Sequence, residues 1–185
     1  MPGAPFPVRV ARPAGRPWNV SKTLLQTIGI WGLALWILPQ LIHRLEFHWG
    51  IPGFSPRALF GWLLFGVASA LGLWSGATMA WLGEGTPLPF DTARRLVIDG
   101  PYCRVRNPMA VAGLTQGFAA GLILGSYAVL LYAMAGGLLW QLAVRPMEEA
   151  DLARRFGDPY ARYCSEVRCW LPRVSPWKPG PHTPC

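Results

Sequence analysis

Residues 109–144 read MAVAGLTQGFAAGLILGSYAVLLYAMAGGLLWQLAV, a stretch of 36 residues without a charged side chain. As one α-helix this stretch would be about 54 Å long, whereas the hydrocarbon core of a bilayer is about 30 Å thick. The helix must therefore break, and Gly125 and Ser126 are the residues best suited to a turn. We predict a short helical hairpin over 109–144.

Two more uncharged runs precede this hairpin, at 58–82 and at 23–42. Each is long enough, at about 1.5 Å per residue, to cross a bilayer. We therefore predict an all-α integral membrane protein with about four transmembrane helices, the last two forming the hairpin, plus cytoplasmic C-terminal helices. The chain then divides into a basic N-terminal tail (1–22), two transmembrane spans (23–82) and a third region (83–185).

The composition agrees with a protein that faces lipid. Hydrophobic residues make up 52% of the chain and charged residues only 14%, and the mean hydropathy is positive, which is unusual for a soluble domain. The net charge of +8 could indicate a nucleic-acid binder. However, the basic residues flank the apolar runs instead of forming a solvated face, so no nucleic-acid partner is expected.

The basic residues also predict the orientation of the spans. Lys and Arg number 15 in the tail, in the segment 83–108 and after residue 144, but only 2 in the loop 43–57 and none at the hairpin turn. Lys and Arg collect on the cytoplasmic side of membrane proteins. We therefore expect both termini, the segment 83–108 and the active site to lie in the cytoplasm.

The four cysteines all fall in segments with this predicted cytoplasmic location, where thiols stay reduced. Cys164 and Cys169 lack a second cysteine pair or a nearby His at the spacing of a zinc site. No metal site is therefore expected.

Two polar segments, 83–108 and 145–172, hold most of the chemically useful side chains. The first contains Pro87 and Pro89 and predicts irregular backbone at the membrane surface, then a short extended piece over 95–98. The second predicts C-terminal helices over 146–168. Pro146 is suited to a first helical position, and the Gly-Asp-Pro at 157–159 predicts a stop within this stretch.

These segments carry a resemblance to a known family. In order, the chain reads GxGTPxPFD from residue 83, RRLVxxGPYxxVRNPM from residue 94, the apolar hairpin, and EExxLxxRFGxxYxxYxxxVxxWLP from residue 148. This order resembles the isoprenylcysteine carboxyl methyltransferase-like family, which includes phospholipid methyltransferases. The resemblance implies a membrane-embedded enzyme that binds S-adenosylmethionine at the cytoplasmic face and makes 83–185 its methyltransferase-like region. The chain contains no GxGxxG, so a Rossmann cofactor domain is not expected.

S-adenosylmethionine carries a carboxylate, an ammonium, a ribose diol, an adenine and a sulfonium, and the resemblance assigns partners to these groups. Arg104, Arg106 and Asn107 offer donors to the carboxylate. Glu148 and Glu149 can bind the ammonium or the ribose, and Tyr160 or Tyr163 can face the sulfonium. Gly83 and Gly85 match a GxG that contacts the cofactor. Arg106, Asn107 and Glu148 are the candidates for a catalytic role.

Ordinary structural roles are open for the same residues. The two glutamates can simply stabilise a helix start, the arginines can mark the cytoplasmic side, and the tyrosines can pack the C-terminal helix onto the membrane surface.

The methyl acceptor is expected to be lipophilic, either a prenylcysteine-like carboxylate or a phospholipid amine. The chain departs from the family where a Tyr and a Gly commonly follow the RNPM motif, since it has Ala110 and Ala112 there. This departure leaves open a non-catalytic binding or assembly protein on the same scaffold. A reductase of related architecture is a third alternative, although no recognisable nicotinamide-binding pattern is present.

Overall fold

The computed structural model describes residue 11 and residues 15–86 and 92–178, and within them every regular element is a helix. The predicted all-α membrane architecture is confirmed. The elements are α1 (Arg16–Trp31), η1 (Gly32–Ile37), α2 (Leu38–His48), α3 (Ala58–Leu82), η2 (Gly100–Cys103), α4 (Pro108–Leu124), α5 (Tyr127–Leu139), η3 (Trp140–Val144) and α6 (Arg145–Glu166). The predictions for Pro87, Pro89, most of the N-terminal tail and the end of the C-terminal tail lie outside the described residues.

Three helices in the described part of the chain are long and apolar enough to cross a membrane: Arg16–His48, Ala58–Leu82 and Tyr127–Glu166. α4 is also apolar but has only 17 residues. Large hydrophobic side chains on their outer surfaces, such as Leu25 and Leu59, are 72% and 78% exposed, as expected for contact with lipid.

The first long helix extends beyond the predicted span at both ends. It begins at Arg16 and ends at His48, whereas the uncharged run covers 23–42. The guanidinium of Arg16 lies 5.4 Å from the centre of the Trp81 ring. This cation–π contact joins the first residue of α1 to the last turn of α3. A helix can continue past the bilayer because its backbone hydrogen bonds are internal, so absence of charge marks the span and not the helix ends.

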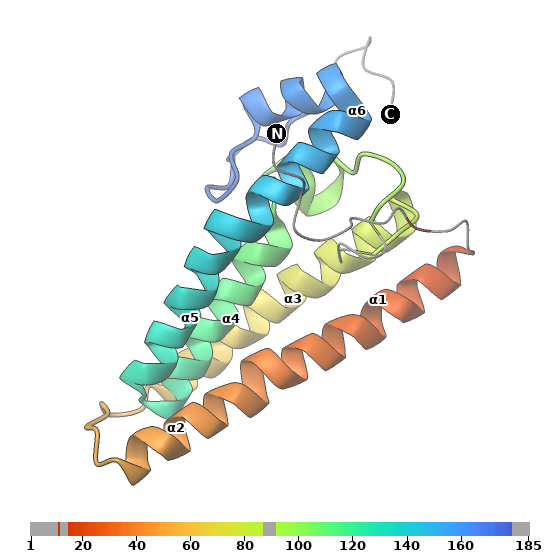
Figure 1. Cartoon of the computed structure of the whole chain (residues 1–185). Coiled ribbons are helices and arrows are strands. Elements are labelled where there is room, and N and C mark those ends of the chain that lie inside the picture. The colour runs from red at the N-terminus through yellow and green to blue at the C-terminus, as the bar shows by residue number, and fades with distance from the viewer. Residues whose placement is uncertain (1–10, 12–14, 87–91, 179–185) are drawn as a thin grey trace.

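α4 packs between α3 and α5, and the first long helix lies along the same bundle (Figure 1). Small residues allow the close approach. A Cβ atom at Gly61 would lie 2.6 Å from Ile123 Cγ1, and one at Gly117 would lie 2.9 Å from the Cβ of Ala133. In lipid, such contacts between small residues are a main source of helix association.

The α4–α5 turn falls at Gly125 and Ser126. Gly125 has φ 64°, and the Ser126 hydroxyl accepts a hydrogen bond from the Val129 N–H at 3.0 Å as the cap of α5. From α2, the buried Glu46 carboxylate accepts from the Ala128 N–H at 3.2 Å. The Phe54 N–H donates to the Gly125 carbonyl at 2.8 Å. This end of the bundle is therefore joined by backbone and carboxylate contacts.

Substitution of Gly125 by Ala should lower the free energy of unfolding by at least about 1–2 kcal/mol, because an L-residue at positive φ is strained. The new Cβ would also collide with the Phe54 carbonyl oxygen. Gly66→Ala is the control, since no atom lies within 4 Å of a Cβ built there. Unfolding in detergent should separate the two variants, and equal stability would contradict this account of the turn.

Two π-helical turns each precede a proline. In an α-helix a proline ring collides with the carbonyl four residues earlier. Pro39 follows η1 and Pro146 follows η3, and the residue before each proline bonds five residues back: Leu38 N–H to Leu33 O, and Arg145 N–H to Trp140 O. The wider turn relieves the collision. α6 begins at Arg145 with Pro146 in its first turn, close to the start that the sequence predicts, and it follows α5 and η3 directly.

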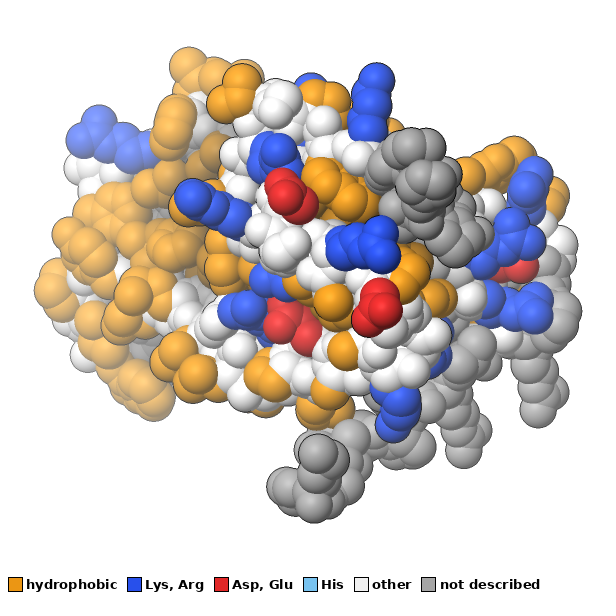
Figure 2. Space-filling model, turned by 90° about the horizontal axis from the view of Figure 1, so that it is seen from above, with side chains coloured by type: hydrophobic (Ala, Val, Ile, Leu, Met, Phe, Trp, Pro, Cys, Tyr) orange, Lys and Arg blue, Asp and Glu red, His pale blue; other side chains and the backbone are white. Residues whose placement is uncertain are grey.

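α6 is broken at Gly157, whose φ of 52° and ψ of −129° are not helical, within the stretch where the sequence predicts a stop. The chain after α6 returns across the loop before α4. The Arg106 N–H donates to the Arg168 carbonyl at 3.0 Å, and the Trp177 N–H donates to the Cys103 carbonyl at 2.8 Å. Viewed from this end, the surface carries many Lys and Arg side chains and few acidic ones (Figure 2).

Candidate active site

A cavity of about 540 Å³ lies where the polar end of the bundle meets its membrane part. Residues of α1, η1, α4, α5 and α6 line it, together with the loop before α4 and Trp170. At one end its wall carries Arg106, Asn107 and Glu148, and farther along α4 it carries Met109 and Leu114. Its size is typical of a site for a cofactor-sized ligand, about 300–1,000 Å³.

Arg106, which the sequence predicts as a cofactor-binding residue, is a cation of this wall. Its side chain is 15% exposed, and its Nη2 lies 3.4 Å from the Glu149 carboxylate. Its Nε is buried and has no hydrogen-bond partner among the described residues. An unpaired buried donor costs free energy, so an anionic group that reached this Nε would stabilise it.

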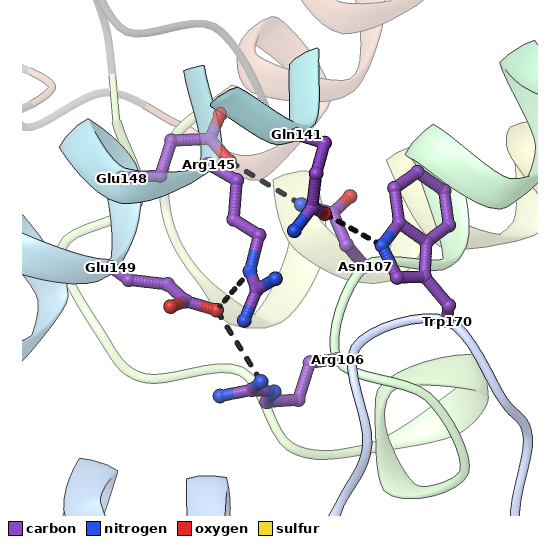
Figure 3. Close-up of polar contacts among 7 residues, drawn as sticks. All are labelled: Arg106, Asn107, Gln141, Arg145, Glu148, Glu149 and Trp170. Carbon is purple, nitrogen blue, oxygen red and sulfur yellow. Dashed lines mark hydrogen bonds and ion pairs between the residues drawn. The ribbon is translucent and has the colours of Figure 1, made fainter. Parts of the chain in front are cut away.

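Asn107 joins two walls of the cavity. Its Oδ1 accepts from the Ala110 N–H at 3.2 Å and so caps α4. Its Nδ2 donates to Oε2 of Glu148 on α6 at 3.3 Å (Figure 3). The residue that caps α4 therefore also holds the Glu148 carboxylate of α6 at the cavity wall.

Glu148 lies one turn beyond the uncharged stretch that ends at Val144. Burial raises the pKa of its carboxyl to about 7, the nearby negative charge of Glu149 adds to this, and the hydrogen bond from Asn107 opposes it. A carboxyl in this condition changes charge near neutral pH and is suited to binding a cation or receiving a proton.

Glu149 follows Glu148 in the chain but does not line the cavity. It accepts from Nε of Arg145 at 2.9 Å and lies 3.4 Å from Arg106, between the two arginines (Figure 3). Of the two glutamates, Glu148 faces the cavity and Glu149 supports Arg106.

Arg104, Gly83 and Gly85 do not line the cavity either. The Arg104 guanidinium donates to the Val174 carbonyl at 2.6 Å on the surface. A Cβ at Gly85 would lie 2.7 Å from Thr92 O, and one at Gly83 would lie 2.8 Å from Ala93 Cβ. The two glycines therefore let the segment after the loop pack closely, and that segment forms part of the wall.

Tyr160 and Tyr163 are buried in a cluster with Ile98 and Val167, outside the cavity lining. The Tyr163 hydroxyl donates to the Tyr102 carbonyl at 2.7 Å. Burial raises the pKa of both phenols, so they remain neutral. In this structure the tyrosines pack the end of α6 onto the loop before α4.

Sequence reasoning missed Asp151 and Arg155, which also line the cavity. The Asp151 carboxylate lies 2.7 Å from Arg155 Nε and 2.6 Å from Arg154 Nη2. Arg155 also donates to the Ala93 carbonyl at 2.6 Å, which attaches α6 to the loop. The sequence did offer one signal, because Arg154 and Arg155 follow Asp151 by three and four residues, the spacing at which side chains meet on a helix.

Gln26, Thr27 and Trp170 were missed for a different reason. Gln26 and Thr27 lie on the first long helix, and no motif marks them. Trp170 lies after α6 and donates from Nε1 to the Gln141 side chain at 2.7 Å (Figure 3). Only the fold brings these residues to one cavity.

The two alanines that depart from the family pattern have separate surroundings. Ala110 lines the cavity. Ala112 is fully buried, and a Cβ at Gly72 of α3 would lie 3.3 Å from the Cβ of Ala112. Ala112 therefore serves close packing of α3 and α4.

Within the described residues, no group of three or more His, Cys, Asp or Glu side chains is placed to hold a metal ion. A search of curated proteins finds no match to this chain. A family model for phospholipid methyltransferases matches residues 56–159, which include α3, α4, α5 and most of α6. This match covers more than half of the chain and contains Arg106, Asn107 and Glu148. The chain therefore belongs to the phospholipid methyltransferase family of membrane methyltransferases.

Proposed function

We propose that this protein transfers a methyl group from S-adenosylmethionine to a lipophilic acceptor, with its active site in the cavity around Arg106, Asn107 and Glu148. One observation carries the proposal. Asn107 is hydrogen-bonded to Glu148 and adjoins Arg106 in the chain, and all three residues line one cavity that is otherwise largely apolar.

The polar end suits the amino-acid part of the cofactor, which is a zwitterion. Arg106 has a buried Nε without a partner among the described residues, and a carboxylate would supply the missing acceptor. Glu148, when ionised, would accept from the ammonium or from the ribose hydroxyls. Because both residues are held by neighbours, little conformational entropy is lost when the ligand binds.

The apolar part suits the acceptor. Methyl transfer is an in-line displacement at the methyl carbon, and its rate depends mainly on alignment of the nucleophile with the sulfonium in a dry site. The Trp140 and Trp170 rings, whose centres are 5.1 Å apart, both line the cavity and give part of its wall an apolar surface. A carboxylate acceptor needs no base, whereas an amine requires a proton acceptor such as Glu148 or water.

The sidedness of the site is part of the proposal. The polar segments 92–107 and 145–178 lie together at one end of the bundle, where Lys and Arg are abundant (Figure 2). The positive-inside rule supports a cytoplasmic position for this end and for both termini. A soluble cofactor would then enter from the cytoplasm and the acceptor from the bilayer.

Methyl transfer from labelled S-adenosylmethionine into a total lipid extract tests the proposal. The purified protein in nanodiscs should bind S-adenosylmethionine, should not bind NADPH, and should label one lipophilic product that mass spectrometry can identify. Binding without transfer to any lipid would favour a non-catalytic protein. Absence of S-adenosylmethionine binding in detergent and in nanodiscs would contradict the proposal.

A further inference from the structure

One wall of the cavity comes from a helix outside the family match. The match covers residues 56–159, whereas the first long helix spans Arg16–His48. Six residues of this helix line the cavity, and they form two adjacent rows at a spacing of four residues: Gln26, Thr27, Ile30, Trp31, Ala34 and Leu35. Residues of the opposite face, Leu25 and Ile28, are 72% and 64% exposed. The helix therefore separates the cavity from lipid.

Gln26 is the polar residue at which this wall begins. Its Oε1 is buried, lacks a hydrogen-bond partner among the described residues, and belongs to a side chain that lines the cavity. A buried amide oxygen without a partner costs free energy. A ligand that donates a hydrogen bond would remove this cost.

The depth of Gln26 can be placed from its neighbours on α3. A Cβ at Gly76 would lie 3.4 Å from Thr23 and 3.6 Å from Met109, whereas a Cβ at Gly72 would lie 2.6 Å from the Trp31 ring. Gln26 lies between Thr23 and Trp31 in the same helix. It therefore lies slightly farther from the polar end of the bundle than Asn107, which precedes Met109.

We infer that Gln26 is a specificity-determining residue that accepts a hydrogen bond from an N–H or O–H group on the head of the methyl acceptor. This inference rests on the proposed function. The apolar chain of the acceptor then lies along Ile30, Trp31 and Leu35, against α4. The residues that suit the cofactor are on segments within the family match, which leaves the Gln26 wall to face the acceptor.

The test compares Gln26→Leu with Gln26→Glu in phosphatidylcholine nanodiscs. The acceptor probes are a graded fraction of phosphatidylethanolamine and added N-acetyl-S-farnesylcysteine, both of which carry an N–H donor. Gln26→Leu should raise the acceptor KM at least about tenfold and leave the Kd for S-adenosylmethionine within about twofold. Gln26→Glu keeps an acceptor oxygen and should restore KM to within about threefold. Gln40→Leu, on the same long helix but off the cavity lining, is the matched control.

An unchanged acceptor KM in Gln26→Leu would overturn the inference. So would a parallel rise in the Kd for S-adenosylmethionine, because Gln26 would then belong to the cofactor subsite. If the wild-type protein neither binds S-adenosylmethionine nor transfers methyl groups, the proposed function fails separately. The inference is then decided by thermal stabilisation with N-acetyl-S-farnesylcysteine, which should be present in wild type and lost in Gln26→Leu; equal shifts, or none, would refute it.

Discussion

Replacement of Arg106 by Leu should weaken binding of S-adenosylmethionine by about 100-fold. A hydrogen bond between charged groups contributes about 1.5–3 kcal/mol, and the ligand carboxylate would also be left without a partner in a partly buried site. Glu149 keeps Arg145 at 2.9 Å in this variant, so the change leaves no unpaired carboxylate at Glu149. Isothermal titration in detergent, with a thermal unfolding curve for each variant, measures the effect.

Arg104→Leu is the matched control, because Arg104 lies in the same loop but contacts the Val174 carbonyl at the surface. This variant should bind the cofactor as the wild type does, within about twofold. Arg106→Lys should bind with intermediate strength, since a lysine keeps the charge but lacks the guanidinium fork. Equal losses in Arg104→Leu and Arg106→Leu would contradict the assignment of the carboxylate site to Arg106.

The second large effect is on the pH dependence of cofactor binding. The pKa of Glu148 is raised to about 7, chiefly by burial. If only the ionised carboxylate binds the cofactor, the Kd of the wild type should rise about tenfold for each pH unit below 7. Glu148→Gln should bind weakly at pH 7.5 and should show no such slope between pH 5.5 and 7. Titrations across this range measure both features.

Glu149→Gln tests whether the pH dependence comes from Glu148 itself or from the loss of any carboxylate at this site. This variant should weaken binding through Arg106, which Glu149 helps to position. It should keep the slope but move it to lower pH, because the negative charge of Glu149 helps to raise the pKa of Glu148. A slope that survives in Glu148→Gln and vanishes in Glu149→Gln would show that Glu149, and not Glu148, is the titrating group.

The stability of the ligand-free protein should also depend on the protonation of Glu148. Cofactor binding should improve as the pH rises, whereas the contribution of this carboxyl to stability should fall. The folded pKa lies above the ordinary value of 4.5, so the folded protein holds this proton more tightly than the unfolded chain. The contribution to stability is therefore complete below pH 4.5 and is lost as the pH rises through about 7. Glu148→Gln should lack this loss.

The sequence was sufficient for the helical membrane architecture because uncharged apolar runs of about 20 residues are typical of transmembrane helices. It also predicted Arg106, Asn107 and Glu148 as candidates, and the fold brings these three to one cavity. Their functional roles stay predictions. Helix ends were less predictable, since a helix such as Arg16–His48, with charged residues at its ends, can extend beyond the bilayer.

The rest of the cavity depends on the directions in which side chains point, and a sequence pattern does not contain these directions. Glu148 and Glu149 are adjacent, but successive residues of an α-helix point about 100° apart, so only one faces the cavity. Arg104 and Arg106 differ because the C-terminal segment lies against this loop, and its Val174 carbonyl accepts a hydrogen bond from the Arg104 guanidinium. Gln26 could not be found at all, because its significance comes from the packing of α1 against α3 and α4.

The π turn η3 has a further consequence for the direction of α6. Trp140 and Glu148 both line the cavity. On an unbroken α-helix, residues eight apart would point about 80° away from each other. The wide turn absorbs one extra residue and rotates the polar half of the helix back into phase with its membrane half. A regular α-turn over the same residues would turn Glu148 about 80° away from the face that carries Trp140, so this segment constrains the site by its conformation as well as by its composition.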